Sequence, residues 1–494
     1  MKKENGVCLI IPPSVFLLDE RVFMSLGILK VAAALKDKFQ VEVLDLSGLE
    51  SFDKVVSDCL NRSDISVFGI TATTPQMPAV TKIVETIRKE RFGAKIILGG
   101  PHATLVNAAR KNELKRGING RGMRAFGQIE KMFDVIVAGD GEKAIFKALE
   151  STALKLVDAD DSKSELFLNN AGLDDTPFPA RQLIDVNSYH YSIDGERALS
   201  LIAQLGCPFG CGFCGGRKSP SFRYIRTRSI EKIIEEVELL YKTYGVKGFM
   251  FYDDELNLNS RVFVKLMNSL SDLQGRLGVN FKLRGFVRPD LFNEEQAKAM
   301  YQSGFRWLLL GFESGSNQML SNMKKKTTST KNAVCVEIAR KYGLKVKALM
   351  SIGHPGESEK SILETHRWLM DVKPEDFDVT AITVYPGTGY YDDAMLHSNK
   401  SGIWVYTADS GDRLYSVEVD YLKVADYYKG DPEGGYRSYV YTDYLTAEEI
   451  VKFRDFLEKD IRRKLNIPFN PGAPRKHFEH SMGMSGVFPS YIKR

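Results

Sequence analysis

The sequence predicts an α/β protein made of two parallel sheets and a small C-terminal α+β region. Two observations carry this prediction: strand–helix alternation runs through the first 150 residues, and it resumes as six successive βα units between about residues 199 and 395. A third is composition: 494 residues, 43% hydrophobic and 27% charged, are ordinary for globular proteins. At roughly 150 residues per domain, this length predicts about three domains.

The N-terminal domain, residues 1–150, is expected to be doubly wound and Rossmann-like, with helices on both faces of the sheet. Strands are expected over 7–11, 41–46, 65–71, 94–98 and 135–138, and helices over 26–35, 80–90 and 142–150. Polar or glycine-rich turns follow the strands at 12–13, 71–74, 99–102 and 139–142. Ligands of doubly wound sheets bind at the carboxyl ends of the strands, so a pocket is expected at these turns.

A basic insertion, residues 106–133, interrupts this domain with seven Lys or Arg and two Glu. Two interpretations remain open: a solvated helical hairpin punctuated by glycines, or a patch for phosphate, nucleic acid or an acidic protein. No set of stacking aromatic residues accompanies the bases, which argues against a nucleic-acid partner.

Three further regions follow. Residues 151–195 are expected to form a linker, 196–395 a partial (β/α)6 barrel, and 396–494 a C-terminal cap or subdomain. Barrel strands are expected near 199–204, 247–252, 280–285, 306–312, 345–352 and 379–384, with helices such as 229–244 and 330–342. The tyrosine-rich stretch 406–444 is either a substrate-shaping cap or a packing subdomain. A helix is expected from Thr446 to about Leu465, opened by a capping box with Glu449.

No apolar run approaches the length of about 18 residues that a membrane-spanning helix needs. The apolar stretch Val7 to Ile11 stops at Pro12-Pro13, which is short for the core of a signal peptide. A cytoplasmic protein without a membrane span is therefore expected.

Cys207, Cys211 and Cys214 form a C-x3-C-x2-C cluster on a glycine-rich loop directly after a predicted strand. A zinc site normally needs four ligands, and neither His190 nor His354 has the local spacing to supply the fourth. A disulfide with one free thiol does not suit the cytosol. A [4Fe-4S] cluster with one open iron remains. The other cysteines, Cys8, Cys59 and Cys335, are isolated among apolar residues and are expected to be core thiols.

The cysteine motif, with Phe213 before its third cysteine, resembles the radical S-adenosylmethionine (SAM) superfamily. Four further segments support the resemblance in the expected order: Asp253-Asp254, Gly311 to Gly315, Ser351 to Glu357 and Val384 to Gly389. It implies that SAM binds the open iron and that one-electron reduction cleaves it to a 5′-deoxyadenosyl radical. The SAM-contacting residues that it implies are Phe213, Gly215, Asp253, Asp254, Glu313, Ser314 and Gly353. Taken alone, Asp253-Asp254 could cap a helix and Pro355-Gly356-Glu357 could start one.

The N-terminal domain resembles the cobalamin-binding domain of cobalamin-dependent radical SAM proteins, in segments 10–13, 17–21, 25–29, 99–104 and 139–142. The cobalamin contacts that this resemblance implies are Asp19, Gly27, Thr71, Thr73, Gly99, Gly100, His102, Gly139, Gly141 and Glu142. Many such domains carry Asp-x-His-x-x-Gly, whose His binds cobalt; here Asp19 and Gly27 are present without that His. A contact from His102 to a phosphate or amide is expected instead. A Rossmann-like domain with another ligand is the alternative.

The resemblance implies cobalamin-dependent methylation of an unactivated carbon. The alternatives are a cobalamin-dependent radical cyclase or rearrangement enzyme, then a methylthiotransferase, then a non-enzymatic cobalamin- or SAM-binding module. Methylthiotransferases usually carry three further cluster-binding cysteines, whereas this N-terminal domain has only Cys8 and Cys59. An electron donor such as flavodoxin or ferredoxin is the expected partner. The sequence does not indicate the substrate.

Overall fold

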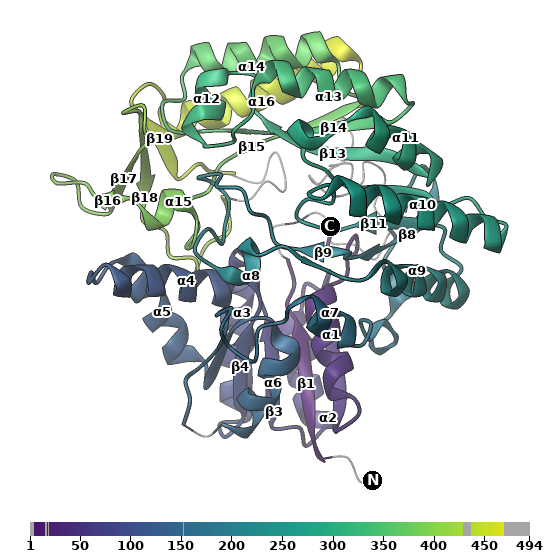
Figure 1. The fold of residues 1–494 in the computed structure, drawn as a ribbon. Coiled ribbons are helices and arrows are strands. Elements are labelled where there is room, and N and C mark those ends of the chain that lie inside the picture. The colour runs from purple at the N-terminus through teal and green to yellow at the C-terminus, as the bar shows by residue number, and fades with distance from the viewer. Residues whose placement is uncertain (1–3, 15–16, 18, 152, 428–435, 469–494) are drawn as a thin grey trace.

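The computed structural model describes residues 4–14, 17, 19–151, 153–427 and 436–468. Figure 1 shows two α/β layers stacked on each other: the N-terminal sheet with its helices, in purple to blue, and the barrel, in teal to green. The short elements β9 (Gln204–Leu205) and α8 (Pro220–Arg223) lie between the two layers. Leu18, part of one segment that resembles cobalamin domains, and residues 469–494 lie outside the described residues.

The N-terminal sheet is fully parallel, with strand order β2-β1-β3-β4-β5-β6. Its strands are β1 (Glu4–Ile11), β2 (Phe39–Asp45), β3 (Val67–Thr71), β4 (Lys95–Gly99), β5 (Val135–Gly139) and β6 (Leu156–Ala159). Its helices are α1 (Leu26–Leu35), α2 (Phe52–Arg62), α3 (Met77–Glu90), α4 (Pro101–Lys115), α5 (Arg121–Met132) and α6 (Gly141–Glu150). The central strands are apolar throughout because helices cover both faces of the sheet.

Two expectations for this region need correction. Strand β6 lies inside the expected linker and extends the sheet; it is only four residues long and ends in an acidic run, so its apolar signal is weak. The expected insertion at 106–133 is not wholly an insertion. Its first part belongs to α4, the helix that crosses from β4 to β5, and only α5 is added. The two helices do form the predicted hairpin.

The second sheet is a curled half-barrel with strand order β15-β14-β13-β12-β11-β8-β7. Its parallel strands are β8 (Glu196–Leu201), β11 (Gly248–Phe251), β12 (Lys282–Phe286), β13 (Phe305–Glu313), β14 (Lys345–Ile352) and β15 (Asp376–Ala381), and β7 (Ser192–Ile193) pairs antiparallel with β8. The helices are α7 (Asn170–Asp175), α9 (Ile230–Tyr244), α10 (Ser260–Leu277), α11 (Glu294–Gln302), α12 (Asn317–Asn322), α13 (Ser329–Lys341), α14 (Glu359–Val372) and α15 (Gly389–Asp392). The predicted fold class is confirmed.

The C-terminal region combines an antiparallel sheet, of order β16-β17-β18-β19, with one long helix. Its elements are β16 (Met395–Leu396), β17 (Ile403–Thr407), β18 (Arg413–Val417), β19 (Val440–Thr442) and α16 (Ala447–Leu465); β10 (Arg226–Thr227) pairs with β9 elsewhere. The predicted capping box at Thr446 and Glu449 opens α16. Glu458 on this helix accepts a 2.8 Å hydrogen bond from the Val379 amide, so α16 covers the open edge of the half-barrel.

Cys8, Cys59 and Cys335 are buried in apolar clusters, as expected of core thiols. Among the described residues, no helix is both long enough and apolar enough to cross a membrane.

Candidate functional site

A cavity of about 750 Å³ opens between the N-terminal sheet and the barrel. Nine of the ten predicted cobalamin contacts line it: Asp19, Gly27, Thr71, Thr73, Gly99, Gly100, Gly139, Gly141 and Glu142. The opposite wall comes from the barrel, including Ser200, Ile202, Ala203, Gln204, Leu205, Tyr252, Asp254 and Tyr385. One cavity therefore joins the carboxyl ends of both sheets.

Four glycines at the strand ends, Gly99, Gly100, Gly139 and Gly141, are among the residues that line the N-terminal wall of the cavity. Gly100 and Gly139 have φ values of 90° and 89°, which L-residues rarely adopt. A Cβ on Gly100 would lie 2.5 Å from Thr71 Oγ1, and one on Gly139 would lie 2.5 Å from the Ala159 carbonyl carbon. A Cβ on Gly99, in contrast, would meet no atom within 4 Å. Glycine at positions 100 and 139 therefore lets neighbouring segments of main chain pack closely, whereas Gly99 borders open space.

His102 is the one predicted cobalamin contact that does not line the cavity. It lies in the first turn of α4, and its Nδ1 is 3.1 Å from Thr74 Oγ1. Complete burial lowers its pKa to about 4, so the ring is neutral. The structure therefore gives His102 a packing role beneath the cavity and does not bring it to a ligand's phosphate or amide.

Asp19 pairs with a histidine from the linker, since its Oδ2 lies 2.7 Å from His190 Nε2. Burial alone would lower the pKa of His190, but the hydrogen bond and charge of Asp19 raise it overall. His354, the other candidate for a zinc ligand, has its two ring nitrogens 2.8 Å from Ser351 Oγ and 3.2 Å from Tyr390 Oη. Neither histidine is directed to the cysteines, so the zinc alternative is not supported.

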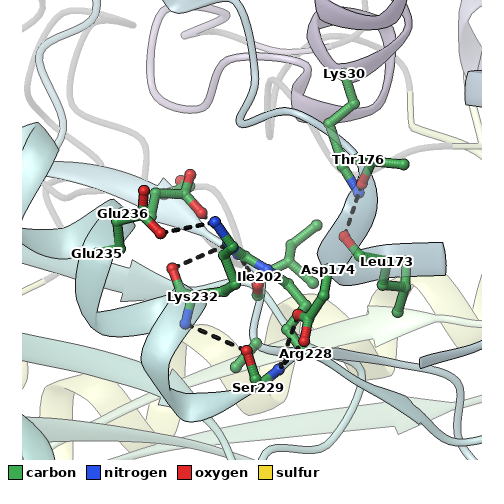
Figure 2. Close-up of polar contacts among 12 residues, drawn as sticks. Lys30, Leu173, Asp174, Thr176, Ile202, Arg228, Ser229, Lys232, Glu235 and Glu236 are labelled. Atoms are coloured by element: carbon green, nitrogen blue, oxygen red, sulfur yellow. Dashed lines mark hydrogen bonds and ion pairs between the residues drawn. The ribbon is translucent and has the colours of Figure 1, made fainter. Parts of the chain in front are cut away.

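The buried carboxylate of Glu236 joins the linker to the barrel, and Figure 2 shows its contact with Arg228. Arg228 donates to the Ile202 carbonyl at 2.7 Å and to Glu236 at 2.6 Å. Arg181 donates to the other oxygen of Glu236 at 2.8 Å. Burial of Glu236 opposes its ionisation, yet the two guanidinium groups hold its pKa below the usual value. This arrangement positions the cavity-lining turn 176–179.

The cysteine loop is held by main-chain contacts on both sides. Gly206, at φ 87°, packs so closely on the Tyr224 carbonyl that a side chain there would clash. The Cys207 amide donates to the Phe222 carbonyl at 2.9 Å, and the Gly212 amide donates to the Met323 carbonyl at 2.9 Å. The sequence thus places three thiols on a tightly closed loop.

The chemistry of this loop fits a cluster better than a single ion. Among the described residues, no three His, Cys, Asp or Glu side chains converge on one metal position. A cubane needs no such convergence, because each thiolate binds a different iron. Burial, with Glu255 and Asp254 nearby, raises the pKa of Cys207 to about 11. The thiol is therefore protonated without iron, and cluster binding must release its proton.

Asp253 and Asp254 organise the start of the cysteine loop. Asp253 accepts hydrogen bonds from the amides of Ala203, at 3.0 Å, and Gln204, and burial raises its pKa to about 7. Asp254 Oδ2 accepts from the Gly206 amide at 2.8 Å and lines the cavity. The possible helix cap is not observed, because Asn259 caps α10.

Glu313 belongs to a buried polar network around the same loop. It has φ 67°, lies 3.1 Å from Lys325 Nζ and accepts from Ser351 Oγ at 2.8 Å. Ser351 contacts His354, which contacts Tyr390, whose ring lies against Gly212. Burial, with the nearby charge of Lys325, lowers the pKa of His354 to about 3. These side chains therefore hold one another in position through hydrogen bonds and an ion pair.

The remaining predicted SAM contacts surround this network but do not line the cavity. The Phe213 ring lies edge-on to His354 at 5.3 Å, and Ser314 Oγ is 3.0 Å from Thr365 Oγ1. The Gly353 amide donates to Glu357 at 3.2 Å. A Cβ on Gly215 would meet Leu105 of the N-terminal domain at 3.2 Å. The possible helix start at 355–357 is slightly early, because Ser358 caps α14.

Sequence reasoning missed three charged residues beside the cysteine loop. Lys325 is buried against Glu313, and Arg288 is buried with its guanidinium 3.4 Å from the centre of the Phe209 ring. Burial raises the pKa of Glu255 to about 7. The acidic run 253–255 and the lysine run 324–326 were available signals, but their partners are distant in sequence.

Two carboxylates of the N-terminal domain hold the segment that follows the cysteines. Asp160 Oδ1 accepts from Ser219 Oγ at 2.6 Å and from the Ser221 amide at 2.9 Å. Asp140, at the cavity, forms an ion pair with Arg226 of β10. The cysteine loop is thereby tied to the N-terminal sheet.

Several basic residues of the 106–133 segment contact other parts of this chain. Arg116 donates to the Asp392 carbonyl at 2.8 Å, and Arg124 pairs with Glu418 at 2.6 Å. Arg121 is buried, with its guanidinium 3.7 Å from the Tyr391 ring centre and 4.6 Å from that of Trp404. The hairpin docks on the C-terminal region, which explains much of its charge without a nucleic-acid partner.

Comparisons with known proteins agree with this architecture. Residues 201–369 match the family model of the radical SAM superfamily, and residues 20–130 match that of the B12 binding domain. The chain is 26% identical to an uncharacterised methyltransferase of Pyrococcus horikoshii, over 80% of this chain and 84% of that protein. It is 24% identical to the bacteriochlorophyllide d C-12(1)-methyltransferase of Chlorobaculum tepidum, over 75% and 74%.

Solved structures share the fold. The radical SAM methyltransferase TsrM from Kitasatospora setae, with cobalamin and a [4Fe-4S] cluster bound, has a TM-score of 0.66 at 17% identity, covering 92% of this chain and 91% of that one. The cobalamin-dependent radical SAM enzyme OxsB has a TM-score of 0.55 at 15% identity, covering 78% and 54%.

The chain belongs to the radical SAM superfamily and combines its domain with a B12 binding domain. It is a radical SAM enzyme. The predicted family is confirmed, together with the cofactors that these two domains use: a [4Fe-4S] cluster, SAM and cobalamin.

Proposed function

We propose that this enzyme methylates an unactivated carbon in a cobalamin-dependent reaction. The observation that carries the proposal is the single cavity that joins the glycine-built edge of the N-terminal sheet to the strand ends beside the cysteine loop. When bound, the cluster and SAM would supply the radical chemistry for hydrogen abstraction, and cobalamin would supply a transferable methyl group. The protein's contribution is to hold the reacting groups close and exclude water.

Each part of the site then has a role. In this proposal Cys207, Cys211 and Cys214 would hold the cluster, and Asp254 and Glu313 would contact SAM beside it. Gly99, Gly100, Gly139 and Gly141 form the wall that receives the corrin or its nucleotide tail, with Glu142 fixed by a 3.1 Å ion pair to Lys30. Tyr252 and Tyr385 line the cavity on the barrel side, where the substrate would bind.

A cyclase is the second candidate, because the chain is 25% identical to the anaerobic magnesium-protoporphyrin IX monomethyl ester cyclase of Cereibacter sphaeroides, over 65% of this chain and 52% of that protein. Both functions use the same cofactors and differ in the fate of the substrate radical. Product analysis separates them.

The test is anaerobic reconstitution with iron, sulfide and hydroxocobalamin, followed by SAM, a strong reductant and mass spectrometry. About four irons per chain, retained corrin and equal amounts of 5′-deoxyadenosine and S-adenosylhomocysteine are expected, because one methylation consumes two SAM. Deoxyadenosine with retained corrin but no homocysteine product would favour the cyclase. Without corrin binding, both proposals fail.

A further inference from the structure

Arg284, in the middle of β12, is a buried arginine whose guanidinium has no hydrogen-bond acceptor or ion-pair partner among the described residues. Only 7% of its surface is exposed, and its Nε is enclosed without an acceptor. The other buried arginines in the described part of the chain each donate to a carbonyl or carboxylate oxygen: Arg121, Arg181, Arg226, Arg288, Arg454 and Arg462. Burying an unpaired charge is costly, so Arg284 indicates a ligand that pairs with it.

Arg284 faces the inside of the half-barrel. The preceding residue, Leu283, packs in the core between the sheet and its helices, and successive strand residues point to opposite faces. Arg284 is in register with Met250 of β11 and Trp307 of β13, which belong to a separate cluster on the inner face. Met250 is in register with Ser200 of β8, which lines the cavity. One row of inner-face residues therefore leads from the cavity to Arg284, two strands or about 10 Å away.

The side chains around Arg284 are aromatic. Its guanidinium lies 5.5 Å from the centre of the Trp307 ring. Phe286, two residues further along the same face of β12, has its ring 6.2 Å from that of Tyr252, which lines the cavity. Phe286, Tyr252 and Trp307 are only partly buried. A molecule that entered from the cavity would thus meet aromatic surface and then one positive charge.

The nearby Lys347 does not share this property. It lies on the same inner face, in register with Leu309 of the inner cluster, and its Nζ is 3.0 Å from Asp376 and 3.8 Å from Asp378. Its charge is compensated within the protein, whereas that of Arg284 is not. A single guanidinium matches a single negative charge, and its planar fork suits the two oxygens of a carboxylate. A phosphate dianion would bring a second charge for which the row from Ser200 to Trp307 offers no second cation.

We propose that Arg284 binds a carboxylate of the substrate, so that the enzyme selects organic acids with an apolar body. The inference rests on the proposed function, because it assigns the substrate class of that same cavity. The acid enters past Tyr252, its body packs on Phe286 and Trp307, and its carboxylate accepts hydrogen bonds from the guanidinium. A charge-assisted pair of this kind is stronger at low exposure than at a surface, which makes Arg284 a specificity-determining residue.

The test measures binding of benzoate to the reconstituted full-length enzyme by ligand-observed NMR, with neutral benzamide as the matched probe. Benzoate should bind saturably, and benzamide more weakly. Arg284→Met, which keeps a long apolar side chain, should weaken benzoate binding about tenfold or more, because a charged hydrogen-bonded pair is lost. The unfolding temperature of the ligand-free variant should be unchanged or higher, since a buried unpaired charge is removed.

The control variant is Arg306→Met. Arg306 lies on β13 and is half-buried, but it donates to the Phe305 carbonyl at 2.6 Å and packs on the exposed Tyr301 ring. Benzoate binding to this variant should equal that of the wild type.

Equal benzoate binding to Arg284→Met and the wild type, or no saturable binding to the wild type, would overturn the proposal. A lower unfolding temperature of ligand-free Arg284→Met would also contradict it, because contacts within the protein would then hold the guanidinium. Tighter binding of phenyl phosphate than of benzoate would replace the carboxylate by a phosphate. Weaker binding of SAM or cobalamin to the variant, with benzoate binding unchanged, would assign Arg284 to a cofactor instead. A wild-type enzyme that binds benzoate but forms no S-adenosylhomocysteine would count against the proposed methylation alone.

Discussion

The two sheets present their ligand-binding ends in different ways. At the N-terminal sheet, glycines at the strand ends (Gly99, Gly100, Gly139 and Gly141) line the cavity beside apolar side chains, and a Cβ on Gly99 would meet no atom within 4 Å. At the barrel, buried side chains bond one another around the cysteine loop, as in the series from Lys325 through Glu313 to His354. A large planar cofactor needs space, whereas a cluster on a short loop needs its ligands fixed in advance. The difference predicts that the two cofactor sites fail separately.

The strongest test of that separation is Cys211→Ala. The variant should retain corrin but lose cluster iron and all 5′-deoxyadenosine formation, because a cubane on this loop depends on all three thiolates. Iron, sulfide and corrin are measured on the same reconstituted sample. Cys335→Ala, which removes a buried thiol on α13 outside the cysteine motif, is the control and should keep both cofactors. Loss of corrin with Cys211→Ala would show that the sites are not independent.

The reciprocal change is Gly99→Leu, which adds a side chain where a Cβ meets no protein atom within 4 Å. Occupying ligand space should cost about 1–3 kcal/mol, or roughly 5- to 150-fold in cobalamin affinity. Cluster iron should be unchanged. Gly275→Leu, on α10 and equally open, controls for the general effect of adding leucine. Equal cobalamin affinity in Gly99→Leu and the wild type would remove Gly99 from the proposed site.

The two sites also differed in how far the sequence predicted them. The glycine turns could be predicted because each turn directly follows its strand in the sequence. Nine of the ten residues implied as cobalamin contacts line the cavity. Around the cysteines, the sequence indicated residues within the motifs but not the side chains that bond them. Asp160 lies 59 residues from Ser219, and Glu313 lies 12 residues from Lys325. His102 was misplaced because a sequence cannot show which way a side chain in a helical first turn points. Strand β6 was missed because four residues give too short a pattern.

A smaller effect is expected where the two sheets are joined. Asp160→Ala removes the acceptor of the Ser219 and Ser221 bonds and leaves buried donors without a partner, which costs about 1–3 kcal/mol. The cysteine loop should then loosen, so iron should leave faster under a chelator while corrin affinity stays unchanged. Asp161→Ala, at the exposed neighbour, is the control. Equal rates of iron loss from the two variants would show that the hydrogen bonds of Asp160 do not stabilise the cysteine loop.

The last prediction concerns the pH dependence of stability and a buried carboxylate of the barrel, Glu357. Burial raises the pKa of Glu357 from 4.5 to about 7, although Ser361 Oγ and the Gly353 amide donate to its carboxylate. Between these two values the folded protein keeps a proton that the unfolded chain has lost, so this group's contribution to stability is present at acidic pH and falls as pH rises through 7. The loss is at most about 1.4 kcal/mol per pH unit.

Glu357→Gln should therefore flatten the decline of the unfolding temperature of the apoprotein between pH 5 and 8. Glu359→Gln, an exposed neighbour, should leave the decline unaltered. If the unfolding temperature of Glu357→Gln declined with pH as steeply as that of the wild type, this carboxylate would be ionised in the folded protein. Its hydrogen bonds in the barrel would then offset the cost of burying its charge.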